Sequence, residues 1–186
     1  MAVGDYLIAR RSPLTTSEDL RKAATAATSR RGARTIQAAL PLLSERSESR
    51  PESRLRVLMV CAGLGEPRVN YVVTNRFGEF VARTDLELPD LGIVLEYQGD
   101  YHRTNRLQWR ADMSRRSKLE ATVRRVMELN ADDLGDPLEL AHRILALAKI
   151  ARPNAELPRL ALTRALRATN RGNSVPERPR GERGRW

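Results

Sequence analysis

The first 45 residues carry apolar positions at helical spacing. Thr16 or Ser17 can cap a helix over residues 17–28, whose first turn is acidic and therefore suits the positive end of the helix dipole. Residues 32–45 place a second set of apolar side chains on one face, and Pro41 bends or ends that run. These residues predict a helical N-terminal segment.

A polar stretch, RSESRPESR, follows and predicts a linker that leads into a helix starting near Ser49–Pro51. Proline is favoured in the first turn of a helix, and Glu52 lies just after it. Apolar residues then recur at positions 55, 58, 59 and 62. Gly63 and Gly65 predict the end of this helix.

The period changes to that of β-strands over residues 69–98. Two β-rich runs are separated by the turn residues Asn75–Gly78. After Pro89 and Asp90 comes LGIVLEYQG, which is almost wholly apolar up to Glu96. Such a run is typical of a central strand that is buried on both faces. We therefore expect a three-strand meander.

The pattern returns to helix over Thr104–Ala121, gives a short strand at 123–129 and then a helix opened by Pro137. Beyond Pro153 there is too little apolar surface to offset the entropy of ordering, so the end is expected to be unstructured.

The resulting order after the linker is helix, three strands, helix, strand, helix, which predicts an α/β layered domain. We divide the chain into a helical N-terminal extension (1–46), the α/β domain (47–151) and a basic, disordered tail (152–186).

The net charge of the chain indicates what kind of partner it binds. The net charge is +10, from 33 basic and 23 acidic residues, and all but three of the basic residues are arginine. A GC-rich coding bias explains the preference for arginine equally well, but a positive chain still attracts polyanions, and arginine binds phosphate in a bidentate manner. From Arg152 to Trp186, nine arginines outnumber three glutamates. We expect DNA as a partner.

Several classes of protein are disfavoured. The lone Cys61 excludes an internal disulfide and lies among apolar residues, so it is expected to be buried. No apolar stretch reaches the roughly 18–20 residues that cross a bilayer, and the start shows no cleavable leader. We expect a cytoplasmic protein with no membrane association.

The chemistry is concentrated in RTDLELPDLGIVLEYQGDYHR. Asp85 is expected on the second strand and Glu96 near the end of the third, so the two carboxylates converge if these strands are antiparallel neighbours. Two converging carboxylates repel each other unless a cation lies between them, and Mg²⁺ or Mn²⁺ prefers such oxygen ligands. Alternatively, Asp85 is a turn or edge residue.

This segment resembles the PD-(D/E)XK nucleases, whose signature is an aspartate followed about ten residues later by Glu-X-Lys. The string EYQGDYHR, with Gln108, Asp112, Arg115 and Arg116 downstream, is similar to a bacterial branch related to very-short-patch-repair endonucleases. Some members of that branch lie behind an antitoxin-type winged helix. The resemblance covers about residues 47–150 and implies a restriction-endonuclease-like core.

The resemblance also implies roles for individual residues. Asp85, Glu96 and the backbone carbonyl of Tyr97 would bind Mg²⁺ or Mn²⁺, and Glu52 matches an acidic position that some members use as a further ligand. His102 is a candidate proton shuttle or phosphate contact. A ridge of arginines would bind DNA or, equally, form the solvated face of a helix: Arg103, Arg106, Arg110, Arg115 and Arg116. Glu52 has an alternative role as a helix-start charge.

One position departs from the family. Gln98 stands where the family has lysine, and a glutamine can orient a water molecule but cannot act as a cation or a base. The leading interpretation is a metal-dependent DNA endonuclease of repair or defence type. The alternative is a nuclease fold with impaired catalysis that binds DNA or regulates a toxin–antitoxin-like system. A protein-interaction domain is a weaker third candidate, and a homodimer is left open.

Overall fold

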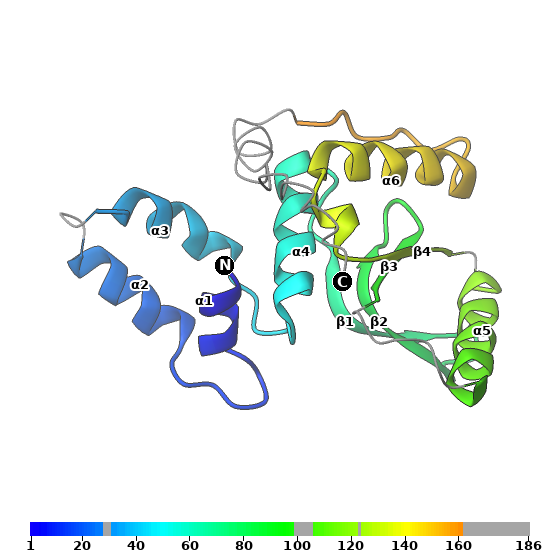
Figure 1. The fold of residues 1–186 in the computed structure, drawn as a ribbon, viewed down its shortest axis with the longest axis horizontal. Helices are drawn as coiled ribbons and strands as arrows, with labels where there is room; N and C mark the ends of the chain where they lie inside the picture. Colours follow the sequence, from blue (N-terminus) through cyan, green and yellow to red (C-terminus); the bar gives the residue numbers. More distant parts are fainter. Residues whose placement is uncertain (28–30, 99–105, 123, 162–186) are drawn as a thin grey trace, which may run out of the picture.

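The structure is a computed structural model that describes residues 1–27, 31–98, 106–122 and 124–161, with the side chains of 106–112 excluded. In those residues the helices are α1 (Ala2–Leu7), α2 (Ser17–Ala26), α3 (Ala33–Ala39), α4 (Arg50–Ala62), α5 (Arg106–Glu120) and α6 (Pro137–Ala151), with 3-10 turns at Leu40–Leu42 and Asp132–Leu134. The strands are β1 (Arg68–Thr74), β2 (Phe80–Leu88), β3 (Ile93–Tyr97) and β4 (Arg125–Leu129) (Figure 1).

The four strands form one mixed sheet in the order β1-β2-β3-β4. The first three strands are antiparallel neighbours, as the predicted meander requires, while β3 and β4 run parallel. A parallel pair needs a crossover connection, and α5 lies within it. The α/β class and the predicted order of elements from α4 to α6 are thus confirmed.

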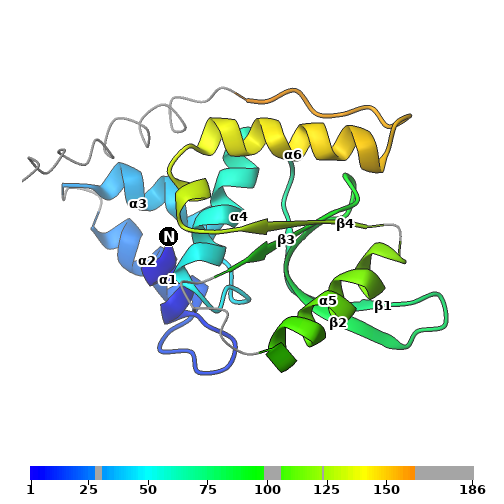
Figure 2. The same cartoon turned by 45° about the vertical axis from the view of Figure 1, so that its right-hand side comes forward.

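Two apolar clusters cover the two faces of this sheet. The larger joins α4 and α6 to the sheet through fully buried side chains such as Leu55, Leu95 and Ile144. The smaller gathers Val94 and Leu119 with residues of β1, β2 and β4 under α5. Figure 2 shows α5 on the opposite side of the sheet from α6. A side chain on β3 therefore faces either α6 or α5, according to its place in the strand.

Local signals set the ends of α4, as predicted. Ser49 caps the helix by accepting a hydrogen bond from the Glu52 N–H, and Pro51 lies in its first turn. At the other end, Gly63 has φ 79°, a left-handed conformation that favours glycine. The beginning of α4 is thereby fixed beside β1 and β2.

Helices α1–α3 lie on the side of α4 that faces away from the sheet (Figure 1). The predicted cap at Thr16 is present, and α3 gives way to a 3-10 turn at Leu40, next to Pro41. The apolar face predicted for residues 32–45 is only partly covered, because Ile36 remains 50% exposed. Helix α1, in contrast, is joined to α4 by the buried pair of Asp5 and Arg56.

The segment after α6 forms no helix or strand up to Ala161. It is nevertheless packed, because Leu157 and Leu160 contact the larger cluster and the Ala161 N–H donates to the Ala62 carbonyl at 2.8 Å. The packed domain therefore extends beyond the predicted boundary at residue 151. Most of the predicted basic tail, residues 162–186, lies outside the described residues.

In the part of the chain that the structure describes, none of the helices combines the length and the apolar character needed to cross a bilayer.

Candidate functional site

Asp85 and Glu96 are next to each other where β2 and β3 separate. The last paired residues of the two strands on this side are Leu86 and Leu95, and Asp85 and Glu96 are the next residues along each strand. There a side chain continues the pairing, because Asp85 Oδ2 accepts a hydrogen bond from the Tyr97 N–H at 2.8 Å. The predicted places of Asp85 on the second strand and Glu96 near the end of the third are confirmed.

Glu96 is a buried carboxylate with one unsatisfied oxygen. Its residue is 4% exposed, and its Oε2 accepts a hydrogen bond from Arg115 Nη2 at 2.8 Å. Its Oε1 has no hydrogen-bond partner within the described residues. Burial raises the pKa of Glu96 to about 7, the Arg115 guanidinium opposes this rise, and the Asp85 carboxylate adds to it. The two carboxylates are therefore close enough to interact electrostatically.

This pKa predicts a pH-dependent stability. From pH 4.5 to about 7 the folded protein holds a proton on Glu96 that the unfolded chain has lost. The free energy of unfolding should therefore fall as the pH rises through this window, by up to about 3 kcal/mol. Urea denaturation of the parent and Glu96→Gln in EDTA at pH 5, 6, 7 and 8 measures the difference. Parallel pH profiles for the two proteins would contradict the assignment.

Arg115 points into the site rather than along an outer ridge. Besides its bond to Glu96, its Nη1 donates to the Arg83 carbonyl of β2 at 3.3 Å. Arg116, its neighbour on α5, instead forms ion pairs with Glu120 and Glu128 at 3.4 and 3.5 Å. Of the five arginines expected to bind nucleic acid, these two thus have internal partners.

Of the other predicted site residues, Gln98 lies close to the carboxylate pair, and several lie outside the residues that the structure describes. Gln98 directly follows β3 and is half-buried, and its N–H donates to the Leu129 carbonyl of β4 at 2.7 Å. His102 and Arg103 lie outside the described residues, as do the side chains of Arg106 and Arg110.

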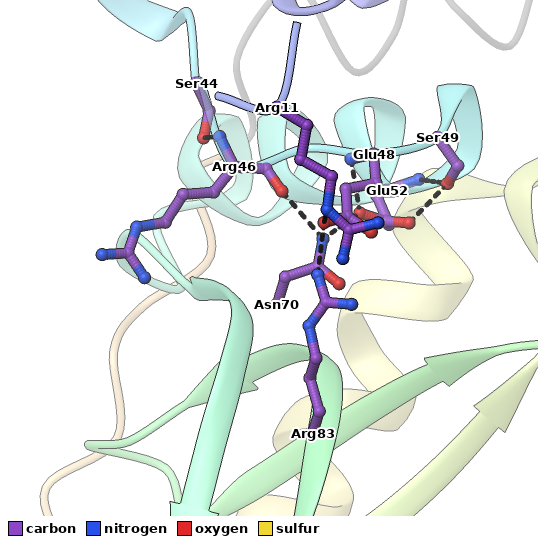
Figure 3. Close-up of polar contacts among 8 residues, drawn as sticks. All are labelled: Arg11, Ser44, Arg46, Glu48, Ser49, Glu52, Asn70 and Arg83. Carbon is purple, nitrogen blue, oxygen red and sulfur yellow. Dashed lines mark hydrogen bonds and ion pairs between the residues drawn. The ribbon is translucent and has the colours of Figure 1, made fainter. Parts of the chain in front are cut away.

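Glu52 has a structural role at the start of α4 (Figure 3). Its carboxylate accepts hydrogen bonds from the Glu48 N–H at 2.9 Å, the Ser49 hydroxyl at 2.7 Å and the Asn70 side-chain amide at 2.6 Å. With Ser49 as the N-cap and Glu52 three residues later, this is a variant of the capping box, in which Glu52 accepts from the N–H of Glu48 instead of that of Ser49. Asn70 belongs to β1, so the box also ties the helix to the sheet.

A chain of charged residues leads from this box toward the carboxylate pair, and Figure 3 shows its first part, from Arg11 through Glu48 to Arg83. Glu48 forms ion pairs with Arg83 of β2 and, at 3.6 Å, with Arg11 from the loop after α1. The Arg83 carbonyl in turn receives the guanidinium of Arg115, which reaches Glu96. The N-terminal segment is thus connected to Glu96 through three intervening residues, which are Glu48, Arg83 and Arg115.

The capping box gives a prediction for Glu52. Glutamine is compatible with this position of a capping box, so Glu52→Gln should cost less than about 1 kcal/mol of stability. Glu52→Ala should cost about 1–2 kcal/mol, because it removes the cap and the bond to Asn70. Neither variant should change any metal-dependent cleavage rate more than about twofold once stability is accounted for. A large loss of metal affinity in Glu52→Gln would instead make it a ligand.

Sequence reasoning missed a buried carboxylate on β2, the strand that carries Asp85. Glu87 is 2% exposed and forms ion pairs with Arg124 Nε at 2.7 Å and Arg68 Nη1 at 3.7 Å. Its alternation with Asp85 along TDLEL was a signal that both side chains emerge on one side of the strand. Arg124 bonds to Oε1 of Glu87, while Oε2 is paired with Arg68 at 3.7 Å without a hydrogen bond, so Glu87 forms structural ion pairs.

The donor set suits a hard cation only in part. Within the described residues, no three His, Cys, Asp or Glu side chains gather closely enough to hold a metal ion. The site offers two carboxylates, one of which has a buried, unsatisfied oxygen. Mg²⁺ is commonly held by one or two carboxylates and keeps several of its waters, so a pair fits this ion.

Comparisons with known proteins give relatives without a described activity. The chain is 32% identical over 118 residues to uncharacterised proteins from two strains of Mycobacterium tuberculosis, CDC 1551 / Oshkosh and ATCC 25618 / H37Rv. The alignment covers 61% of this chain but only 43% of each relative. No family model matches the chain. No solved structure matches it significantly.

Proposed function

We propose that the chain is a Mg²⁺- or Mn²⁺-dependent DNA endonuclease of repair or defence type, built on a restriction-endonuclease-like core. The observation that carries this proposal is the pair of Asp85 and Glu96 at the divergence of β2 and β3, with a buried carboxylate oxygen that has no partner in the described residues. The order of helices and strands from α4 to α6 supports it. The resemblance over residues 85–98 supplies the reaction class.

Each residue of the site has a role in this proposal. Asp85, Glu96 and the Tyr97 carbonyl would hold the ion, which when bound lowers the pKa of a water molecule and stabilises charge on the scissile phosphate. Gln98 orients a water molecule through its side-chain amide. Arg115 holds Glu96 in place and balances its charge in the metal-free protein.

DNA is the substrate that the charge favours. The net charge of +10 attracts the phosphate backbone, and the binding should weaken steeply as salt is raised. The absence of a lysine at position 98 leaves phosphate neutralisation to the ion and to arginine.

The proposal predicts metal-dependent nicking. The purified chain should convert supercoiled plasmid to the open-circular form with Mg²⁺ or Mn²⁺ and should fail to do so with EDTA, because water activation at this site needs the ion. Gel electrophoresis of the plasmid over time measures the rate. Equal nicking with EDTA would reveal a contaminating or metal-independent activity and would contradict the proposal.

A second candidate is a nuclease fold that binds DNA without cutting it, as part of a toxin–antitoxin-like system. Two observations favour it: Arg115 already forms an ion pair with Glu96, and Gln98 replaces the lysine of the family. Salt-sensitive DNA binding without cleavage in any divalent metal would support this candidate over the endonuclease. Loss of DNA binding altogether would exclude both.

A further inference from the structure

The only two phenylalanines of the chain are both on the surface. Phe77 and Phe80 are 72% and 68% exposed and lie at the turn that joins β1 to β2. Burying such a side chain contributes about 1.5–3 kcal/mol, and aromatic residues make up only 4% of the sequence. One exposed apolar residue is ordinary, but two neighbouring aromatic rings at one end of a hairpin point to a binding surface.

These rings line a hollow, and most of the charged residues that also line it are basic. The hollow has a volume of about 850 Å³ and lies between the hairpin and the C-terminal end of α5. Arg76, Lys118 and Arg124 contribute to its lining. Its one acidic residue, Glu79, accepts a hydrogen bond from the Asn75 side-chain amide at 2.7 Å. Apolar rings and excess positive charge thus share one surface, which we call the hairpin surface.

The hairpin turn is held in one conformation. Asn75 Oδ1 accepts hydrogen bonds from the N–H groups of Phe77 and Glu79 at 2.9 and 3.0 Å. Gly78 has φ 82° and donates to the Asn75 carbonyl at 3.0 Å. The Arg76 guanidinium stacks on the Phe77 ring, 4.7 Å from its centre. Because the turn is already ordered and Arg76 contacts the Phe77 ring, a ligand that stacks on this ring has less ordering entropy to overcome.

We propose that the hairpin surface binds an unpaired stretch of nucleic acid, with a base stacked on Phe77 or Phe80 and phosphates facing Arg76 and Lys118. Aromatic rings stack on bases of any sequence, and neighbouring cations follow the backbone. A second copy of the chain fits this surface less well, because it would bring the same cations and the same net charge of +10.

One ring of the hairpin surface, that of Phe80, is on the same strand as Asp85. Phe80 is five residues before Asp85 on β2, which corresponds to about 16 Å along an extended strand. A strand of DNA bound at Asp85 would therefore need only a few further nucleotides to span this distance. The inference rests on the proposed nucleic-acid substrate but not on cleavage.

The test is binding in EDTA by the full chain, measured by fluorescence anisotropy with a labelled single-stranded oligonucleotide and with a blunt duplex of the same length. The double variant Phe77→Leu/Phe80→Leu keeps apolar surface but loses the rings. Its affinity for the single strand should fall by a factor on the order of 5 to 150, the cost of losing base stacking, with little change for the duplex. Its salt dependence should match that of the parent, since no charge is removed.

Two further variants make the result specific. Ile150→Ala removes an apolar side chain that is 63% exposed at the end of α6, and it should bind like the parent. Lys118→Gln should weaken binding to both nucleic acids and flatten the salt dependence. Single-strand binding by the leucine variant as tight as that of the parent would overturn the inference, as would an equal loss for the duplex. If the parent sediments as a dimer and the leucine variant as a monomer, while their affinities for nucleic acid are equal, the surface is instead the contact with a second copy of the chain.

Failure of the inference and failure of the endonuclease proposal are distinguishable. Selective loss of single-strand binding in the leucine variant supports the hairpin surface even if the parent cuts no plasmid. If the parent cuts plasmid with metal but the leucine variant binds the single strand as tightly as the parent, the inference about the hairpin surface is wrong. The endonuclease proposal would still hold.

Discussion

Replacing Glu96 with glutamine, or Asp85 with asparagine, is expected to reduce Mg²⁺-dependent nicking by about three orders of magnitude. Each change keeps the size of the side chain but removes a negative charge from a site that has two carboxylates among the described residues. A divalent ion that stabilises several kcal/mol of transition-state charge cannot be held well by a single carboxylate. The effect should appear in the rate of plasmid conversion at saturating metal.

The matched control is Asp90→Asn. Asp90 lies in the turn between β2 and β3, is exposed, and carries the same charge five residues from Asp85. Its variant should nick at the rate of the parent. All three variants should bind DNA in EDTA at least as tightly as the parent, because the carboxylates that they remove repel phosphate rather than attract it. Glu96→Gln and Asp85→Asn that cut as fast as Asp90→Asn would show that the pair is not the site.

Stability separates this loss of activity from misfolding. Burial raises the pKa of Glu96 to about 7, so its charged form destabilises the metal-free fold at neutral pH. Glu96→Gln removes that charge and should unfold at a higher urea concentration than the parent at pH 8 in EDTA. A variant that is more stable and yet inactive cannot have lost activity by unfolding.

The sequence predicted well those features that depend on local patterns. Pro51 and Gly63 mark the ends of α4, and the change of period near residue 69 marks the sheet. Asp85 and Glu96 could be placed together because an antiparallel register follows from the short connection at Pro89 and Asp90.

Features that depend on long side chains from distant segments could not be predicted. Arg115 is one of several arginines with similar spacing on α5, and only the packing of that helix over β3 turns it toward Glu96. Glu52 is acidic at a position that suits both a helix cap and a metal site, and its bond to Asn70 of β1, which gives it a structural role, could not be read from the sequence. Periodicity shows which face of an element is buried but not which neighbour meets it.

Composition also misled at the start of the tail. The segment after α6 is poor in apolar residues, yet Leu157 and Leu160 contact the core, and one backbone bond joins Ala161 to Ala62. A few well-placed contacts beside an existing core suffice to position a short segment, although they could not form a core alone.

The largest expected loss of stability comes from Arg56→Met. Arg56 is 2% exposed and lies between Asp5, which is 1% exposed, and the more accessible Glu66. Methionine fills much of the same volume but leaves the Asp5 carboxylate buried without its cation. Such a broken buried pair costs about 3–5 kcal/mol. Urea denaturation of the full chain at pH 7 measures the change.

A double variant tests whether the uncompensated charge causes the loss. Asp5→Asn keeps the oxygen that accepts the Ser44 N–H at 2.9 Å but removes the charge. Adding it to Arg56→Met should therefore restore about half or more of the lost stability, which is a coupling within the range of contacting residues. Purely additive losses would show that Arg56 acts by packing alone. Asp5 belongs to α1 and Arg56 to α4, so a positive coupling would also establish that the N-terminal helix folds as part of the α/β domain. The ion pairs that link Arg11 to Arg83 would then join parts of one cooperative unit.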